Sequence, residues 1–345
     1  MRAALHILTH NSAAQIDACL ACLLAQDYPD LALTVIDNAS TDDTLARLAP
    51  WRARGVRVVA HRENLYYARA HNLALLDPSA ADDAAIVFTV NPDVLLAPTF
   101  VSHVMAVFDR HPGVGAVNGK LLLLEGGDFT PALVAAPPDP DALLDSAGLM
   151  IYRSRRPYLR GNRLAARDHC LEPCAIFGVD GACAAYRRAM LDDIALNVDG
   201  RPEYFDDDFV MYREDVDLAW RAQLFGWESR YEPAALGYHV RSFHLGLGLG
   251  LGRGRAKMSP FFRRHSVKNG WFLLVKNDEP GALLRHLPFV LPYQAKILAG
   301  LLTIERSSLG ALGDFRRLLP RFRAKRAQIL ARRRRTMAEL AHWFV

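Results

Sequence analysis

The sequence has few cysteines and no long apolar run. Its five cysteines are an odd number, and Cys19-x-x-Cys22 has no second pair at zinc-ligand spacing. We therefore expect reduced, buried thiols, and neither a disulfide framework nor a zinc site. No window holds the roughly 20 uninterrupted apolar residues of a membrane-spanning helix, and residues 1–6 lack the apolar core of a signal peptide. These absences predict a cytoplasmic chain that meets a membrane only at its surface.

The charge is distributed unevenly along the chain. A composition of 51% hydrophobic and 23% charged residues is that of a folded globular protein, which excludes extensive disorder. The net charge of +5 collects after residue 250, at Arg253, Arg255, Lys257, Arg263, Arg264 and the run 332–335. Such a basic region indicates an anionic partner, either a phospholipid surface or a nucleic acid.

The basic tail favours a membrane over nucleic acid. It lacks a nucleic-acid-binding motif and interleaved base-stacking aromatics. The run 332–335 instead stands near apolar residues that could anchor the tail, namely Leu340, Trp343, Phe344 and Val345. We expect peripheral contact with the anionic inner face of the cytoplasmic membrane and no nucleic-acid partner.

The first 120 residues alternate short apolar runs with helical stretches, a pattern typical of a parallel sheet with crossover helices. The expected strands are 4–8, 33–36, 56–60 and 85–90, and the expected helices are 14–25, 42–48 and 68–76. Polar segments follow several of these strands directly. Ligands of open α/β sheets bind at the carboxyl ends of the strands, so these segments are candidate site residues.

The second part of the chain has other patterns. Residues 121–140 read as a long surface connection, 145–163 as a hairpin, 177–191 as strand, turn and helix, and 212–225 as a helix capped by Gly226. The Gly/Leu stretch 245–254 lacks the spacing of a dinucleotide-binding fingerprint and does not follow the first strand, so it favours a mobile flap. The last ninety residues are predicted to be helical.

Four segments carry chemistry in a fixed order: Leu8-Thr9-His10-Asn11-Ser12, the stretch 35–42, Val90-Asn91-Pro92-Asp93, and the stretch 212–217 followed by Arg221 and Gly226. Together they resemble glycosyltransferase family 2 over about residues 3–277, in its rhamnosyltransferase-like branch. The resemblance implies a GT-A-type α/β fold with a mixed, mainly parallel central sheet flanked by helices, plus a helical C-terminal extension.

The resemblance also implies a domain organisation and a reaction. We expect a glycosyltransferase domain at 1–245, with a nucleotide-binding half at 1–120 and an acceptor half at 121–245. The flexible Gly-rich flap and the basic helical extension then occupy 246–345. The implied activity is metal-dependent, inverting transfer of a sugar from a nucleoside-diphosphate donor to a hydroxyl of a glycan or lipid-linked acceptor, in cell-surface polysaccharide synthesis.

Candidate donor contacts lie after the first two strands. Asp37 ends a strand and is followed by small polar residues, so its carboxylate can accept a hydrogen bond from a pyrimidine N3–H or a ribose hydroxyl. The resemblance implies that Thr9, Asn11, Asp37 and Asn38 line this pocket. The alternative for Asp37 is helix capping, the role that we expect for Asp42.

The stretch 62–72 resembles the family's N-x-G-x-x-x-x-x-N segment, which makes Asn64 a further donor contact. The usual glycine is replaced here by Leu65 or Tyr66, a departure from the family pattern. Arg69 could pair with a diphosphate oxygen through its planar guanidinium, or it could be a solvated helix arginine. Both interpretations of Arg69 remain open.

Asn91-Pro92-Asp93 stands where the family has its acidic metal motif. The Asp93 carboxylate is a hard ligand suited to Mn²⁺ or Mg²⁺, while Asn91 offers only a neutral carbonyl, so metal binding without the donor should be weak. The alternative is a plain turn. The resemblance implies His239 as a further metal ligand, against the alternative of a structural histidine.

The pair Glu214-Asp215 is the catalytic candidate. Inverting transfer is a direct displacement, so a base must take the proton of the acceptor hydroxyl. The resemblance implies that Asp215 is this base and that Glu214 orients the acceptor or a neighbouring arginine. The stretch 177–183 resembles the family's acceptor-side segment, which implies Asp180 and Gly181 on the acceptor side, against the alternative of a tight turn.

Neighbouring acidic residues are given structural roles. Asp217 is expected on a solvated or structural face, paired with Arg221 four residues on. Asp206, Asp207 and Asp208 are expected to decorate the acidic N-terminus of a helix, where the helix dipole favours them.

The donor and the reaction class have rivals. Thymidine-diphosphate rhamnose is the first choice of donor and a uridine-diphosphate sugar the second. A nucleotidyltransferase would need a Gly-rich, Lys-containing loop after the first strand, and residues 10–14 form no such loop. A catalytically degenerate sugar-nucleotide-binding protein is the other rival, because of Asn91 and the missing glycine near Tyr66.

Overall fold

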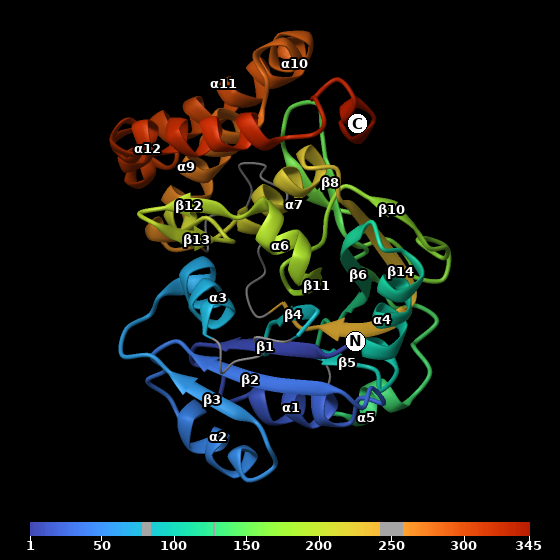
Figure 1. The fold of residues 1–345 in the computed structure, drawn as a ribbon. Helices are drawn as coiled ribbons and strands as arrows, with labels where there is room; N and C mark the ends of the chain where they lie inside the picture. The colour runs from blue at the N-terminus through green and yellow to red at the C-terminus, as the bar shows by residue number, and fades with distance from the viewer. Residues whose placement is uncertain (78–83, 127, 242–257) are drawn as a thin grey trace.

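The computed structural model of the chain describes residues 1–77, 84–126, 128–241 and 258–345 (Figure 1). The predicted flap 245–254, with Arg253 and Arg255, lies outside the described residues. All five cysteines are free, as expected, and Cys19, Cys22 and Cys183 are buried.

The first ninety residues form the elements expected from their periodicity, each within a few residues of the predicted bounds. They are β1 (Ala3–Thr9), α1 (Ile16–Leu24), β2 (Leu31–Asp37), α2 (Thr44–Arg52), β3 (Arg57–Ala60), α3 (Tyr66–Leu76) and β4 (Ile86–Val90). Three elements that were not predicted follow, namely β5 (Val94–Leu96), α4 (Phe100–Arg110) and β6 (Val114–Leu123).

The middle of the chain contains short strands, α-helices and a 3₁₀ helix that lead into the long strand β14. Its elements are α5 (Ala132–Ala135), β7 (Leu144–Ser146), β8 (Leu149–Ile151), β9 (Pro157–Leu159), β10 (Cys174–Ile176), β11 (Cys183–Arg187), α6 (Arg188–Ile194), β12 (Leu196–Val198), β13 (Arg201–Glu203), the 3₁₀ helix η2 (Asp207–Phe209), α7 (Glu214–Leu224) and β14 (Glu228–His239). The hairpin expected at 145–163 is formed by β8 and β9.

The C-terminal part is helical, as predicted. It consists of α9 (Pro260–Asn277), α10 (Pro280–Arg285), α11 (Leu287–Thr303), η3 (Arg306–Ser308), α12 (Gly310–Arg332) and η4 (Ala341–Trp343). Among the described residues no single helix is long and apolar enough to cross a bilayer. By length and composition, α11 and the segment 306–332 would be sufficient only together, and they are bent by 109° relative to each other.

The central sheet is mixed, in the strand order β10-β14-β6-β11-β4-β1-β2-β3. β1 pairs in parallel with β2 and β4, and β11 joins the two halves by pairing antiparallel with β4 and β6. β1 and β4 are almost entirely apolar and buried, as expected for strands covered on both faces. The carboxyl ends of β1, β2 and β4 therefore meet at one edge, where the predicted donor side chains begin.

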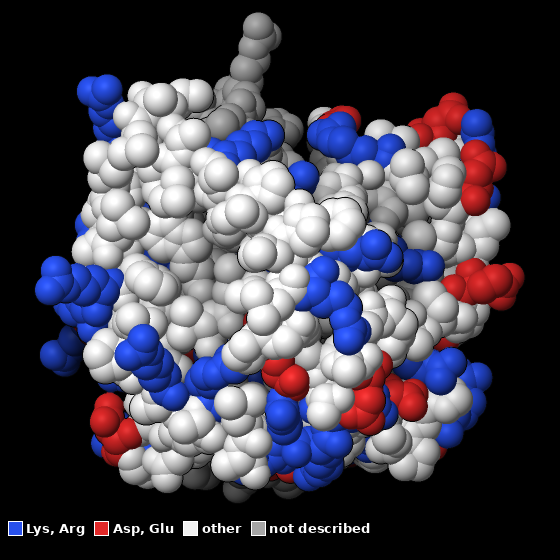
Figure 2. All heavy atoms as spheres, turned by 90° about the horizontal axis from the view of Figure 1, so that it is seen from above, with Lys and Arg blue, Asp and Glu red and all other residues white. Residues whose placement is uncertain are grey.

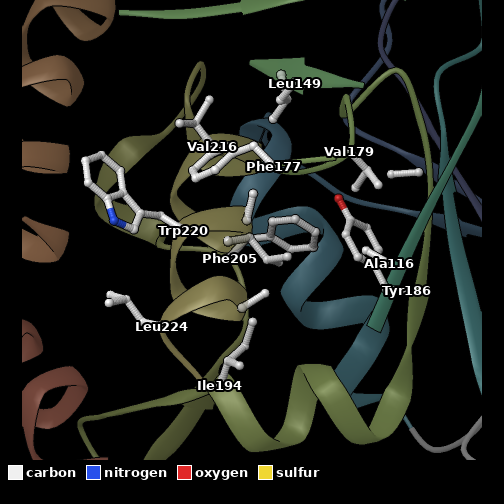
Figure 3. Packing of buried hydrophobic residues seen from close by; sticks show 14 of the residues in the cluster. Ala116, Leu149, Phe177, Val179, Tyr186, Ile194, Phe205, Val216, Trp220 and Leu224 are labelled. Carbon is white, nitrogen blue, oxygen red and sulfur yellow. The ribbon is translucent and has the colours of Figure 1, made fainter. Parts of the chain in front are cut away.

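Helices cover both faces of this sheet (Figure 1). One hydrophobic cluster packs α1, α2 and α4 on one face, and the largest cluster packs α3, α6 and α7 on the other. Val216, Trp220 and Leu224 of α7 belong to this second cluster together with Phe177 and Phe205 (Figure 3), and the ring centroids of Phe177 and Trp220 lie 6.3 Å apart. The packing fixes the helix that begins with the catalytic candidates.

The C-terminal helices share the core of the α7 face. The rings of Phe272 on α9 and Phe322 on α12 stack with centroids 3.6 Å apart, and both belong to the cluster that contains Trp220. The predicted domain boundary at residue 245 remains a proposal. Described residues from before and after this boundary pack around one core.

The predicted role of the tail as a membrane anchor is wrong for Leu340 and Phe344, whereas Val345 is exposed. Leu340 and Phe344 are buried in the core, and Trp343 packs against it. Arg332 donates a hydrogen bond to the backbone carbonyl of Asp193, and Arg334 donates one to the Asp193 carboxylate. Most of the basic and apolar side chains that indicated a lipid surface thus have partners within the chain.

A buried ion cluster, formed by Asp206, Asp217, Lys276 and Lys325, joins the C-terminal helices to the rest. Lys276 Nζ lies 2.8 Å from Asp217 Oδ2 and 2.5 Å from Asp206 Oδ2. Lys325 Nζ contacts Asp206 from α12. Burial alone would raise the pKa of Asp206, but the two lysines hold it well below its usual value.

The cluster adds to one expectation about acidic residues and corrects another. Asp206 caps the 3₁₀ helix η2 by accepting the Asp208 N–H, as an acidic helix N-terminus requires, but it is also fully buried and pairs with lysines from α9 and α12. Asp217 pairs with Arg221 as expected, at 2.9 Å, but the solvated alternative is wrong because both side chains are buried.

Replacement of Lys276 by methionine should destabilise the fold strongly. It leaves the buried carboxylates of Asp206 and Asp217 without a shared partner, a loss worth about 3–5 kcal/mol of unfolding free energy. The matched control is Arg167→Met, which removes an exposed pair with Asp141 and should cost about 0–1 kcal/mol. Denaturant unfolding of both variants measures the difference, and equal losses would contradict the assigned role of Lys276.

Candidate active site

The candidate donor site begins where β1 and β2 end side by side, with Thr9 opposite Asp37. Asp37 is fully buried, and its Oδ1 accepts hydrogen bonds from the hydroxyls of Thr9 (3.0 Å) and Ser40 (2.6 Å). Its Oδ2 accepts the Ser40 N–H at 3.1 Å. The carboxylate therefore organises the loop after β2, and its contact with a nucleoside remains a prediction.

Asn38 and Asn64 hold the neighbouring loop. Asn38 Nδ2 donates to Asn64 Oδ1 at 2.8 Å, and Asn38 Oδ1 accepts the Leu65 N–H at 2.7 Å. Tyr66 has φ +57°, so it occupies the left-handed conformation for which the family's glycine is suited. This finding places the missing glycine at Tyr66 rather than Leu65.

Two other predicted donor contacts are exposed at the edge of this site. Asn11, with φ +53°, accepts the Thr41 N–H through Oδ1 at 2.7 Å and so ties the loops after β1 and β2 together. Arg69 is an exposed residue of α3. Asp42 accepts from the N–H of Thr44, the first residue of α2, as expected of a capping residue.

The predicted metal ligands meet at the end of β14. His239 Nε2 lies 3.3 Å from Asp93 Oδ1, although 146 residues separate them in the sequence. His239 Nδ1 lies 2.8 Å from Asp145 Oδ2, and that carboxylate is fully buried. Burial alone would lower the pKa of His239, but its hydrogen bonds to Asp145 and Asp93 raise it to about 9.

Asp145 connects the metal candidates to the acceptor side. Arg241 donates to both oxygens of Asp145, and its Nη2 lies 3.8 Å from Asp180 Oδ2. Burial raises the pKa of Asp180, an effect that Arg241 opposes. Asn91 borders the same segment, since its N–H donates to the Ala182 carbonyl at 2.8 Å.

The catalytic candidates adjoin this segment from the start of α7. The Gly181 N–H donates to Asp215 Oδ2 at 3.3 Å, and a Cβ at Gly181 would lie 3.6 Å from the Asp215 side chain. The Tyr67 hydroxyl donates to the Gly181 carbonyl at 3.1 Å. The structure thus brings Asp180, Gly181 and Asp215 together, as the sequence interpretation required.

The two carboxyl groups of the pair have different surroundings. Burial, followed by repulsion from Asp180, raises the pKa of Asp215 to about 6. Burial and the neighbouring Asp215 raise the pKa of Glu214 well above its usual value. Glu214 Oε2 is buried and has no hydrogen-bond partner among the described residues. An ionised Asp215 beside a protonated Glu214 fits a base next to an orienting group.

The residue before the pair has a strained backbone. Arg213 has φ +73°, an uncommon value for a side chain of this size, and its Nε donates to the Ser266 carbonyl on α9 at 3.3 Å. It also borders a cavity between α9 and α11 whose lining includes Arg155, Tyr293 and Lys296. This cavity lies directly beside the start of α7.

Sequence reasoning missed Asp145, Arg241, Tyr67 and Arg213. Asp145 and Arg241 orient His239 and Asp180, and Tyr67 positions Gly181. A weak signal existed for Asp145, a single acid within an apolar stretch, and for Arg241, two residues after the metal candidate. Neither signal identifies a partner without the fold.

The sequence model described as Glycosyl transferase family 2 matches residues 5–123. The chain is 29% identical over 252 residues to the N-acetylglucosaminyl-diphospho-decaprenol L-rhamnosyltransferase of Mycobacterium tuberculosis, covering 69% of this chain and 76% of that protein. It is 21% identical over 228 residues to the poly-beta-1,6-N-acetyl-D-glucosamine synthase of Staphylococcus epidermidis, covering 66% of this chain and 47% of that protein.

Solved structures agree with this assignment at the level of the fold. S. aureus TarS matches with a TM-score of 0.56 at 18% identity over 94% of this chain, which spans half of that structure's chain. The mannosyltransferase PcManGT from Pyrobaculum calidifontis, in complex with GDP-Man and Mn2+, matches with a TM-score of 0.52 at 18% identity, covering 96% of this chain and 85% of that chain. Residues 5–123 therefore match glycosyltransferase family 2, and the fold of the chain is similar to that of these solved glycosyltransferases.

Proposed function

We propose that this glycosyltransferase transfers a sugar, with inversion and with the help of a divalent metal, from a nucleoside-diphosphate donor to a hydroxyl of a lipid-linked or glycan acceptor. Thymidine-diphosphate rhamnose is the first choice of donor and a uridine-diphosphate sugar the second. The reaction would serve cell-surface polysaccharide synthesis, with peripheral contact at an anionic membrane surface. The name of the mycobacterial relative, a rhamnosyltransferase acting on a diphospho-decaprenol sugar, supports this choice.

The position of Asp215 carries the proposal. Its carboxylate is held at the start of α7, beside Asp180 and within 3.3 Å of the Gly181 N–H. With a pKa of about 6 it is largely ionised near neutral pH, so it can take a proton from a hydroxyl as the new bond forms. A protonated Glu214 next to it can donate a hydrogen bond to the acceptor without adding a second negative charge.

Asp93 and His239 fit a divalent ion. Neighbouring ligands of an octahedral ion with bonds of about 2.1 Å lie about 3 Å apart, close to the 3.3 Å between Asp93 Oδ1 and His239 Nε2. The hydrogen bond from Nδ1 to Asp145 is the outer contact that orients a metal-bound histidine. No group of three or more His, Cys, Asp or Glu suited to a metal occurs in the described parts of the chain, so the donor diphosphate must complete the ligand set.

The ion would neutralise the charge that develops on the departing diphosphate. Asp93 and His239 hold that end of the site, while Arg241 keeps Asp145 and Asp180 in place between it and Asp215. Residues at the carboxyl ends of β1 and β2, including Thr9, Asp37 and Asn38, would hold the nucleoside. Asn64, Arg69 and Asn91 complete the proposed donor contacts.

A donor panel tests the proposed activity. Purified protein with a polyprenyl-diphosphate sugar acceptor should release nucleoside diphosphate from thymidine-diphosphate rhamnose faster than from uridine-diphosphate sugars. The readout is diphosphate release together with mass spectrometry of the product. Binding of donor with no release from any of them would instead establish a degenerate sugar-nucleotide-binding protein.

Removal of the base should lower turnover without lowering donor affinity. Asp215→Asn keeps the shape of the side chain and should reduce kcat by about 10² to 10⁴, because general-base assistance is lost. Glu214→Gln keeps a neutral donor and should reduce kcat much less. Donor titration by calorimetry serves as the control, and near-normal turnover of Asp215→Asn would assign the base elsewhere.

The same pair of variants reports on pH. In the wild type, kcat/KM should fall as the pH drops through about 6, since Asp215 becomes protonated and cannot accept the proton. The residual activity of Asp215→Asn should lack this acidic limb. An unchanged limb in that variant would contradict the assignment.

Metal dependence should centre on Asp93. Chelator should abolish transfer and added Mn²⁺ or Mg²⁺ should restore it, while Asp93→Ala should remove activity with the fold intact. Mn²⁺ binding, followed by electron paramagnetic resonance with nucleoside diphosphate present, should weaken in Asp93→Ala and not in Asp109→Ala, a change of an exposed acid on α4. Full activity of Asp93→Ala in excess chelator would exclude the metal role.

A further inference from the structure

The outer face of α10, α11 and the adjoining turn is apolar and exposed. Figure 2 looks onto this end of the molecule and shows a broad area of uncharged side chains with Lys and Arg around it. The exposed apolar side chains of this interfacial face are Leu284, Leu287, Phe289, Leu291, Leu298, Leu302 and Ile304. Leu291 and Leu302 are each 61% exposed. A patch of this kind on a folded chain marks an interaction site.

The charges of this segment are of one sign at the surface. Between residues 280 and 312 the basic residues are Arg285, Lys296 and Arg306, and all three are exposed. The single acid in that range is Glu305, which is buried. Apolar side chains flanked by exposed cations match a surface of lipid tails beneath anionic headgroups.

The face lies on the surface of the protein and is backed by core. Val290 and Leu301 point inward from α11, and Leu301 packs with Val267 of α9 and Ala311 of α12. α12 cannot leave this packing to complete a bent membrane span, because its Lys325 side chain is bound in the buried ion cluster. The geometry therefore fits a helix pair lying in the headgroup region.

The interfacial face is close to the proposed catalytic pair. The cavity beside Arg213 is lined from the other side by residues of α11, including Tyr293, Lys296 and Gly300. Arg213 directly precedes Glu214 and contacts Ser266 of α9. The cavity thus lies between residues of α11 and the residue that precedes the catalytic pair.

We propose that the interfacial face of α10 and α11 docks onto an anionic lipid bilayer and thereby presents the start of α7 to acceptors held in that bilayer. The proposal deepens the membrane contact included in the proposed function. It assigns that contact to α10 and α11 instead of to the tail 332–345. Vesicle binding without donor or acceptor tests it separately from transfer, so the two can fail independently.

The test is sedimentation of the full chain with vesicles of phosphatidylcholine and phosphatidylglycerol at a ratio of 7:3, a mixture chosen for its negative charge. Leu291→Asp/Leu302→Asp should weaken binding at least about tenfold, because both carboxylates would enter the apolar layer. Arg285→Gln/Arg306→Gln should weaken binding about 30-fold at low salt. Wild-type binding should fall with added salt and on pure phosphatidylcholine.

The matched control is Leu45→Asp/Leu171→Asp, which adds the same charges at exposed leucines outside this face and should bind like the wild type. Circular dichroism must show that every variant is folded. Equal binding by Leu291→Asp/Leu302→Asp and the control would overturn the proposal. Absence of wild-type binding to the vesicles would also overturn it. Light scattering would then show whether the chain is a monomer or forms a dimer that Leu291→Asp/Leu302→Asp breaks.

Discussion

The structure depends on the buried carboxylate of Asp217. It lies two residues after Asp215 and receives Arg221 from its own helix, and Lys276 and Asn277 from α9. A buried charge costs little only when every lone pair is satisfied, so this set of partners fixes the rotation and height of α7. Because α7 is fixed, the neighbouring Asp215 can stand at the Gly181 N–H with a defined proton affinity.

The same interaction makes the C-terminal helices part of the site. Lys276 and Lys325 reach Asp206 from α9 and α12, and the aromatic rings of these helices stack between them. α11 in turn rests on α9. The outer face is therefore connected to the start of α7 by packed helices rather than by a linker.

Much of the fold was predictable where the pattern is local. The apolar runs and helical periodicity of the first ninety residues predict β1 to β4 and α1 to α3, because each element is decided by neighbours in the sequence. Long-range partners were not predictable from pattern. Asp93 and His239 were paired only through the family resemblance, and Asp145 was missed because nothing nearby marks its partners. The basic run 332–335 led to the expectation of a membrane anchor for the same reason, because the sequence does not show that Asp193 binds two of these arginines.

The two ends of the site are joined by charges that alternate in sign over much of their path. From the metal candidates to the base they run in the order Asp93, His239, Asp145, Arg241, Asp180 and Asp215. In a buried site with few waters, the proton affinity of each group depends on the charge of its neighbours. Under the proposed function, a donor diphosphate bound at Asp93 changes the field that reaches Asp180 through Arg241. Departure of the leaving group and proton uptake by Asp215 would then be coupled through Asp145, Arg241 and Asp180.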